Sequence, residues 1–271
     1  MPVVALQGQL RSPHVSFAVD TVASWWWATL RMVFPHAVAA VVLPDGFRVV
    51  AACEAPGDAF RAISARGVEL SRRLGSVRPV WRPMAEPRVA PSLAAARRWA
   101  LEALRRPCAR GLVDDPVGWR WSTARDQAGA VCDPWVDGSG WNGMVMGPRH
   151  GRGADAPQLR AVADRASDRS TPLSAIAAAA GEATRTSPEA IARPGATRNV
   201  FVWLGRAEGW AIPTLASLCG TASCTTRVVA AEPNPAWRAA AARCLWDPRI
   251  CAGRWAPAGT RGADLIQRRE P

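Results

Sequence analysis

The patterning of apolar residues changes near residue 135, and this change constrains the fold more than any other feature of the chain. Residues 1–135 alternate strand-like and helix-like segments, whereas residues 159–250 carry helical patterning throughout. Residues 136–158 are rich in glycine, proline and aspartate, as in DGSG at 137–140, which is typical of a linker. We therefore predict two domains, at 1–135 and 159–250, joined by this linker and followed by a tail at 251–271.

The N-terminal segment has the element order of an α+β domain. Its strongest apolar run, HAVAAVVL at 36–43, indicates a buried strand that ends at the turn signal Pro44-Asp45-Gly46. The other predicted elements are strands at 15–19 and 47–53, an extended piece at 77–84, and helices at 25–34, 59–74 and 93–106, the last beginning after the N-cap Ser92 and ending at Pro107. This order predicts a small antiparallel sheet with helices on one face.

The C-terminal segment is predicted to be all-α. Helical patterning occurs at 158–166, 173–180, 199–207, 213–219, 225–231 and 236–245. The stretch around Gly220 has the pattern of two short helices joined by a glycine turn.

The charge of the chain indicates a polyanionic partner. The formal net charge is +12 with a pI near 11.1, the chain has 34 arginines and no lysine, and the excess is spread over the whole chain. Phosphate backbones are the commonest partners of such basic proteins. A very GC-rich coding sequence also produces chains rich in alanine, arginine and tryptophan without lysine or tyrosine, so codon bias is the alternative explanation for part of this charge.

The sequence predicts a cytoplasmic protein with no membrane partner. No apolar stretch approaches the ~20 residues that span a bilayer, and the N-terminus lacks the charged and apolar regions of a secretion signal. The seven cysteines are scattered, which indicates reduced thiols. Cys219, Cys224, Cys244 and Cys251 are poor candidates for zinc ligands, because four and six residues separate the members of each pair.

Residues 105–123 carry the most distinctive pattern, RRPCARGLVDDPVGWRWST. This stretch resembles the Asn-Pro-Val-Arg-Ala-Gly-Leu-Val…Pro…Tyr/Trp-x-Trp-Ser-Ser stretch of REP-associated tyrosine transposases, relatives of the insertion-sequence single-strand transposases. The match is good over about twenty residues, and the order of upstream elements extends the resemblance to roughly residues 14–135. The resemblance implies a ferredoxin-like α+β domain.

The chemistry of that family requires a metal site and a nucleophile. Two histidines at i and i+2 of a strand hold a divalent metal such as Mg²⁺, which polarises the scissile phosphate, and a tyrosine on a facing helix attacks the phosphorus. The Met-Pro-Asn-His-x-His motif falls here on residues 43–48, so that Gly46 and Arg48 occupy the ligand positions, and the tyrosine position falls on Glu102. The resemblance therefore implies a protein with no catalytic residues, no metal cofactor and no DNA cleavage.

The residues at these positions have other interpretations. Arg48 is able to hold a phosphate through a bidentate contact, or to lie exposed on its strand. Glu102 is four residues from both Arg98 and Arg106, which predicts a surface ion-pair ladder along a helix. The tryptophans are expected mainly in the core; Trp99, Trp119 and Trp121, which lie next to arginines, are less favoured candidates for stacking single-stranded bases.

A second resemblance lies in the helical segment. RNVFVWLGR at 198–206 and GTASCTT at 220–226 are similar to the Arg-x-x-x-x-Tyr-Leu-Ala-Arg helix and the Gly-Gly-Arg-Asp-His-Thr-Thr turn in the C-terminal helix-turn-helix of the bacterial replication initiator DnaA. The base-reading Arg-Asp-His triplet is replaced by Ala-Ser-Cys at 222–224. The contacts to DNA phosphates that the resemblance leaves are Arg198, Thr225, Thr226 and Arg227.

We expect a transposase-like DNA-binding protein that does not cut DNA. Its partner is DNA, with single-stranded hairpin ends as the first candidate, and a homodimer is left open. Two alternatives remain: an active strand-transfer nuclease with a serine or cysteine nucleophile, and a non-functional remnant that binds nothing specifically.

Overall fold

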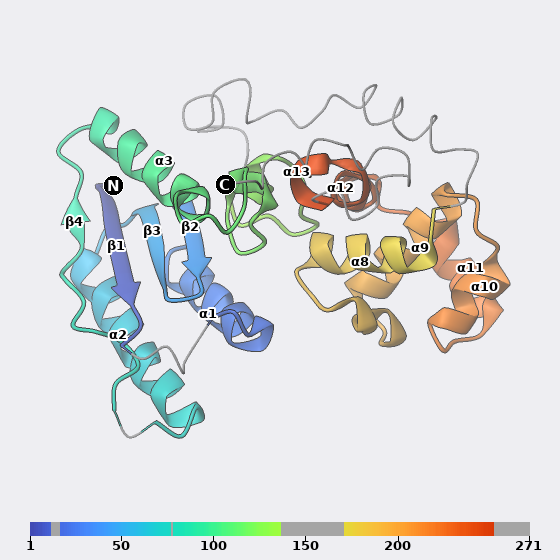
Figure 1. The fold of residues 1–271 in the computed structure, drawn as a ribbon, viewed down its shortest axis with the longest axis horizontal. Helices are drawn as coiled ribbons and strands as arrows, with labels where there is room; N and C mark the ends of the chain where they lie inside the picture. Colours follow the sequence, from blue (N-terminus) through green and yellow to red (C-terminus); the bar gives the residue numbers. More distant parts are fainter. Residues whose placement is uncertain (12–16, 77, 137–170, 252–271) are drawn as a thin grey trace, which may run out of the picture. The chain divides into compact units, whose positions relative to one another are not determined.

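The computed structural model describes residues 1–11, 17–76, 78–136 and 171–251, so most of the predicted linker, the predicted helix at 158–166 and the tail from residue 252 lie outside the described part (Figure 1). The chain forms two compact units. One contains Met1–Ala128 and Pro134–Gly151, and the other contains Gly129–Asp133 and Arg152–Pro271.

The first unit is built on a four-stranded antiparallel sheet. Its strands are β1 (Val3–Gln9), β2 (Ala37–Leu43), β3 (Gly46–Ala52) and β4 (Arg88–Val89), in the order β2-β3-β1-β4. These strands confirm the predicted α+β class and the β2–β3 hairpin. In that hairpin Leu43 pairs with Gly46.

Two strand predictions were wrong. The N-terminal strand is β1, not residues 15–19, of which 17–19 form a turn and bend and 15–16 lie outside the described residues. The edge strand is β4, because residues 78–84 pair with the sheet only through a bridge between Leu10 and Trp81. Prolines at 79 and 83 lack the N–H that a longer ladder would need.

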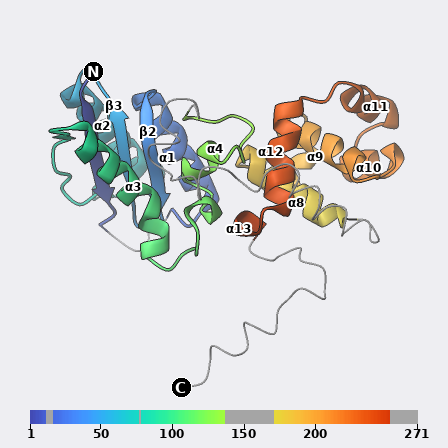
Figure 2. The ribbon, with the colours of Figure 1, turned by 90° about the horizontal axis from the view of Figure 1, so that it is seen from above.

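Helices cover both faces of the sheet, which corrects the prediction of helices on one face. The helices α1 (Asp20–Val33) and α2 (Pro56–Arg73) share a core with Phe47 and Val49, whereas α3 (Leu93–Ala109) contacts β2 and β3 on the opposite face (Figure 2). The reason lies in β2, which is buried at every position from Val38 to Leu43. A strand that is apolar on both sides requires cover on both sides.

The core beneath the sheet is aromatic. Trp26 of α1 is fully buried, and its ring centroid lies 4.8 Å from that of Trp81, 5.4 Å from that of Phe47 and 6.0 Å from that of Phe17. Tilted and stacked aromatic contacts of this kind stabilise a core beyond their buried area. The tryptophan cluster of α1 therefore fixes this helix against the hairpin.

The start of α3 agrees with the sequence, but its end does not. The Ser92 hydroxyl accepts a hydrogen bond from the Ala95 amide at 3.1 Å, which confirms the predicted N-cap. The helix continues past Pro107 to Ala109. Because Pro107 lies in the last turn, it removes only one backbone donor there without ending the helix.

The described part of the second unit consists of helices, as predicted. They are α8 (Leu173–Thr184), the 3-10 helix Pro188–Ala192, α9 (Ala196–Ala207), α10 (Ile212–Leu218), α11 (Ser223–Ala231), α12 (Pro235–Trp246) and α13 (Pro248–Cys251). Gly220 has a φ of 59° between α10 and α11, a conformation that favours glycine at this turn. No helix within the described residues is long and apolar enough to cross a membrane.

Candidate functional site

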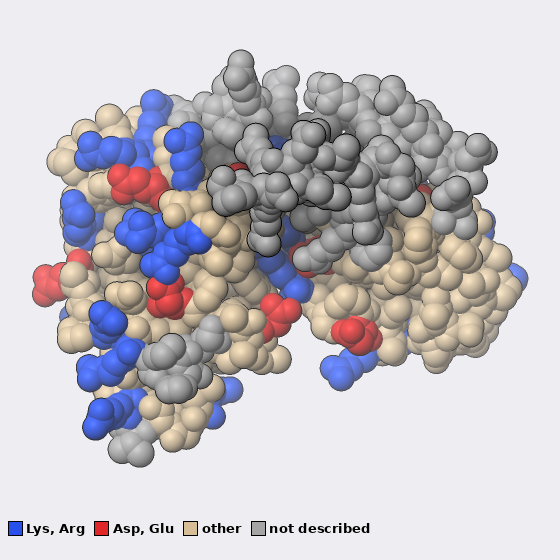
Figure 3. Space-filling model, viewed as in Figure 1, with Lys and Arg blue, Asp and Glu red and all other residues tan. Residues whose placement is uncertain are grey.

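A hollow of about 320 Å³ opens between the sheet and the C-terminal half of α3. We call it the arginine hollow, because four arginines and a single carboxylate line it. Its charged and amide-bearing residues are Gln7, Gln9, Asp45, Arg48, Arg82, Arg106 and Arg110. Figure 3 shows that arginines gather over α3 and its surroundings, whereas the visible face of the second unit is mostly uncharged.

The side chain of Arg48, in β3, lines this hollow. Phe47 and Val49 point into the aromatic core, so the side chain between them points to the other face of the sheet, toward α3. Burial lowers the pKa of Arg48 below its ordinary value, Arg106 lowers it further, Glu102 raises it and Arg110 lowers it again. Since a guanidinium stays charged at neutral pH, this balance marks a place where positive charge is crowded and an anion is favoured.

Glu102 faces the Arg48 region, and the predicted ion-pair ladder was wrong. Among the described residues, no ion pair within 4.0 Å joins Glu102 to Arg98 or Arg106. Glu102 instead lines two further hollows, separate from the arginine hollow, together with Arg48. Its negative charge raises the pKa of that arginine. The structure thus brings together the two positions that the resemblance equates with a nucleophile and a metal ligand.

Gly46 leaves no room for a side chain. A Cβ atom built there would collide with the carbonyl oxygen of Gly8 and would lie 3.2 Å from Cα of Gln9, both backbone atoms of β1. Neither Gly46 nor the cationic Arg48 offers a donor to a divalent metal. Within the described ranges no three His, Cys, Asp or Glu side chains are grouped closely enough to hold a metal. The residues present therefore do not fit the metal that the resemblance implies.

The segment after α3 is used to hold the sheet edge. The Trp119 indole N–H donates to the carbonyl oxygen of Val42 at 2.7 Å, and the Val42 amide donates to the carbonyl oxygen of Trp121 at 2.9 Å. Farther along β2, the Ala40 amide donates to the hydroxyl of Thr123 at 2.9 Å. The distinctive pattern at 105–123 thus ties the end of α3 to the free edge of β2.

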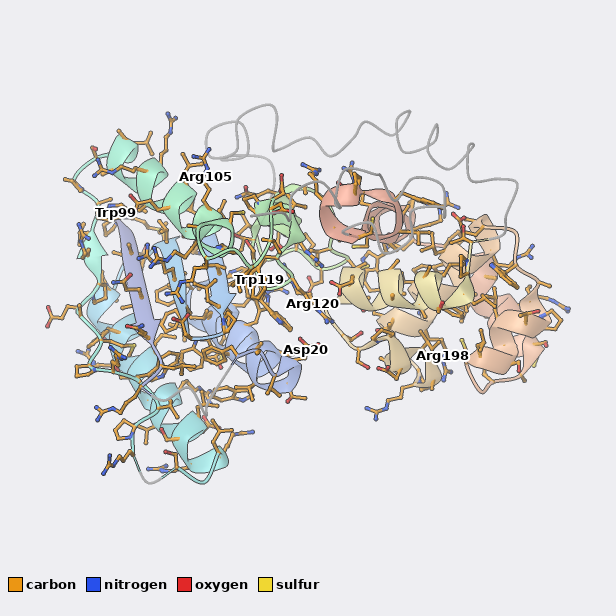
Figure 4. The ribbon with its side chains drawn as sticks, viewed as in Figure 1. Asp20, Trp99, Arg105, Trp119, Arg120 and Arg198 are labelled. Atoms are coloured by element: carbon orange, nitrogen blue, oxygen red, sulfur yellow. The ribbon has the colours of Figure 1, made fainter. Side chains whose placement is uncertain are left out.

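Of the three tryptophans considered for stacking, Trp99 lines a hollow together with Arg48 and Glu102. Trp121 is buried, and Trp119 is half-buried with its N–H bonded to Val42. Trp99 is half-buried on α3 (Figure 4), and the guanidinium carbon of Arg88 lies 4.8 Å from its ring centroid. No local pattern in the sequence distinguishes Trp99 from the other two.

Of the four predicted phosphate contacts in the second unit, Arg198 and Thr226 bond to backbone carbonyl oxygens within it. The other two, Thr225 and Arg227, are exposed. Arg198 (Figure 4) donates to the carbonyl oxygens of Ile191, Ala192 and Cys219 at 3.1, 2.5 and 3.3 Å, and so holds neighbouring helix ends together.

Thr226 is buried, with its hydroxyl 3.3 Å from the carbonyl oxygen of Ala222, so it corrects the prediction of a surface contact. Thr225 and Arg227 are exposed on α11, as contacts to DNA require. Cys224, in the replaced triplet, is exposed as well.

Most residues of the arginine hollow were not predicted from the sequence. Arg106 and Arg110 were visible as an i, i+4 pair on the helix that carries Glu102, which is a signal for one helix face. Gln7, Gln9 and Arg82 reach the site only through strand pairing and the path of the chain after α2, and no local pattern indicates them.

Comparison with known proteins gives one distant structural similarity. No protein-family model matches the sequence. No curated protein matches it either. A solved structure described as a REP-associated tyrosine transposase bound to a REP hairpin is similar to this chain at a TM-score of 0.39 and 15% identity, over 57% of this chain and 93% of that one.

Proposed function

We propose that this chain is a transposase-like DNA-binding protein that does not cut DNA. The observation that carries the proposal is the arginine hollow, which lies where the resemblance puts the metal and the scissile phosphate. Arg48 and Arg106 supply positive charge there, and the only carboxylate lining this hollow, Asp45, is paired with Arg110. The planar guanidinium group of arginine can donate two hydrogen bonds at once to phosphate oxygens.

The proposed fold of the N-terminal domain, residues 1–135, is ferredoxin-like. The succession β1, α1, β2, β3, α2, β4 with the strand order β2-β3-β1-β4 supports it. We further propose a helix-turn-helix within 159–250, formed by α10 and α11, in which Thr225 and Arg227 contact DNA. Arg198 and Thr226 would hold that unit together.

The proposed lack of cleavage follows from the donor set. Gly46 has no side chain, Arg48 is a cation, and Glu102 stands where the family has its tyrosine. Neither the Lewis acid nor the phenolate nucleophile of the family's reaction would form with these residues. What remains is an anion-binding surface.

The test is fluorescence anisotropy with a labelled hairpin that carries single-stranded flanks, a matched duplex and a scrambled single strand, each over a salt series. Preference for the hairpin that persists near physiological salt would support retained recognition. Equal binding that collapses steeply with salt would leave only nonspecific phosphate attraction. A covalent protein–DNA adduct on a denaturing gel would favour the nuclease alternative, and non-cooperative unfolding would favour the remnant.

A further inference from the structure

A second, smaller hollow adjoins the arginine hollow. Its volume is about 170 Å³, and it lies between α3 and the part of the sheet formed by β1, β3 and β4. Arg48 lines both hollows, so the two spaces meet at one guanidinium. We call the smaller space the Trp99 hollow, after the one aromatic residue that lines it in the described part of the chain.

The walls of the Trp99 hollow offer planar surfaces. The indole of Trp99 and the guanidinium of Arg88 lie against each other with 4.8 Å between the guanidinium carbon and the ring centroid. Alanine and valine side chains from β1, β3 and α3 supply apolar lining. Nucleobases stack on both aromatic rings and arginine planes, and proteins that bind single strands combine such stacking with positive charge along the backbone.

The rim of the Trp99 hollow supplies hydrogen-bonding groups. The Glu102 carboxylate is an acceptor, and the exposed Gln7 amide is both a donor and an acceptor. The exocyclic amino group of a base would donate to Glu102. Thymine, which has no exocyclic amino group, would lack this contact. A carboxylate beside an aromatic ring would repel a phosphate, so this hollow suits a base and not a second phosphate.

The helix arranges these groups in sequence. Trp99, Glu102 and Arg106 are separated by three and then four residues, which places them along one face of α3. At 1.5 Å per residue the row from Trp99 to Arg106 is about 10 Å long. This arrangement puts a stacking group at one end and positive charge at the other.

We propose that the two hollows together bind one unpaired nucleotide, with its base in the Trp99 hollow and its phosphate on Arg48 and Arg106. This inference rests on the proposed DNA-binding function and adds the chemistry that would distinguish an unpaired base from a duplex backbone. A base within a duplex is stacked on its neighbours and does not enter the site.

The probe is a labelled single-stranded oligodeoxynucleotide, compared with a strand of equal length in which every base is absent. The wild-type protein is expected to bind the base-containing strand roughly 5- to 100-fold more tightly, as stacking of one base predicts. Trp99→Leu removes that preference and leaves the affinity for the abasic strand unchanged, whereas Trp99→Phe keeps most of the preference. Arg106→Ala weakens the binding of both strands equally.

The matched control is Trp25→Leu. Trp25 is also half-buried under an arginine, with the guanidinium carbon of Arg73 at 5.4 Å, but it borders neither hollow. Its replacement should leave the preference intact. Equal binding of both strands by the folded wild-type protein would overturn the nucleotide site while DNA binding stands. A protein that binds neither strand would overturn the proposed function itself.

Discussion

Arg110, at the C-terminal end of α3, forms an ion pair with Asp45 in the turn between β2 and β3. The pair joins residues 65 positions apart in the chain and fixes the mouth of the arginine hollow. It also neutralises Asp45, the carboxylate that lines this hollow among the described residues.

Replacing that carboxylate should strengthen DNA binding. Asp45→Asn releases Arg110 and raises the local positive potential, which is expected to increase affinity for a single strand by roughly two- to fivefold at low salt, with a steeper salt dependence. Anisotropy titrations at several salt concentrations measure both effects. Asp58→Asn is the control, since Asp58 pairs with Arg61 on the exposed surface of α2. A weaker complex with Asp45→Asn would show that the ion pair contributes to binding through the shape of the site.

Removing positive charge from the hollow should act uniformly on all DNA sequences. Arg48→Ala is expected to weaken binding by roughly 3- to 10-fold and to reduce the slope of log affinity against log salt by about 1, as the loss of one phosphate contact does. Arg61→Ala, on the exposed face of α2, should change neither quantity. An unchanged slope for Arg48→Ala would place the DNA elsewhere.

Any side chain at position 46 should destabilise the first unit. Gly46→Ala forces a Cβ against the backbone of Gly8, and a cost of about 1–3 kcal/mol in the free energy of unfolding is expected from overpacking. Urea denaturation measures this loss. Gly57→Ala is the matched control, because the nearest atom to its Cβ would be the far end of the Arg61 side chain at 3.7 Å. A stable Gly46→Ala protein would show that β1 moves away without cost.

The exposed thiol of Cys224 reports on α11. In the native protein Cys224 should react with a maleimide well before the buried Cys132, Cys219 and Cys244. If α11 contacts DNA as proposed, a bound duplex should slow the labelling of Cys224. Mass spectrometry of peptides locates the label, and Cys53, half-exposed on the first unit, serves as the internal reference. Equal labelling with and without DNA would remove α11 from the interface.

The alkaline stability of the protein should depend on its cysteines. Burial raises the pKa of Cys132 to about 12, helped by Cys244 and Asp133. A thiol whose folded pKa lies above its unfolded value of about 8.5 favours folding less as pH rises, so its contribution is lost from pH ~8.5 upward until the folded thiol also ionises near pH 12. The chain has no lysine or tyrosine to titrate in the same window.

The loss is at most about 1.4 kcal/mol per pH unit for one buried thiol. Urea unfolding at pH 8 and pH 10 measures it, and Cys132→Ala should flatten the dependence. The exposed Cys224→Ala provides the comparison variant. A variant at position 132 that loses stability as steeply as the wild type would assign the alkaline transition to other groups.

Local patterns predicted the parts of the fold that depend on local physics. The β2–β3 hairpin follows from an apolar run and a turn signal, and the start of α3 follows from Ser92. The placement of α3 across the sheet does not follow from its own sequence, because it depends on which faces of β2 remain uncovered after α1 and α2 have packed. β1 was missed although Val4 and Leu6 alternate with exposed positions, a signal that was present.

Sequence alone predicted only those residues of the candidate site that occupy a position of a known family motif. Arg48 and Glu102 were found in this way, but they come close together because α3 packs against β3. The closeness of Gly46 to Gly8 comes from the pairing of β1 with β3, and no pattern around either glycine indicates it.

The path of the chain after residue 128 decides how the protein can be cut into pieces for study. The Cys132 amide donates to the carbonyl oxygen of Ala183 at 2.9 Å in the second unit, whereas the Trp135 amide donates to the Asp126 carboxylate at 2.8 Å in the first. A fragment that ends at residue 128 loses the partner of Asp126, and one that begins at residue 152 loses the partner of Ala183. Recombinant halves should therefore overlap, each retaining residues 129–136.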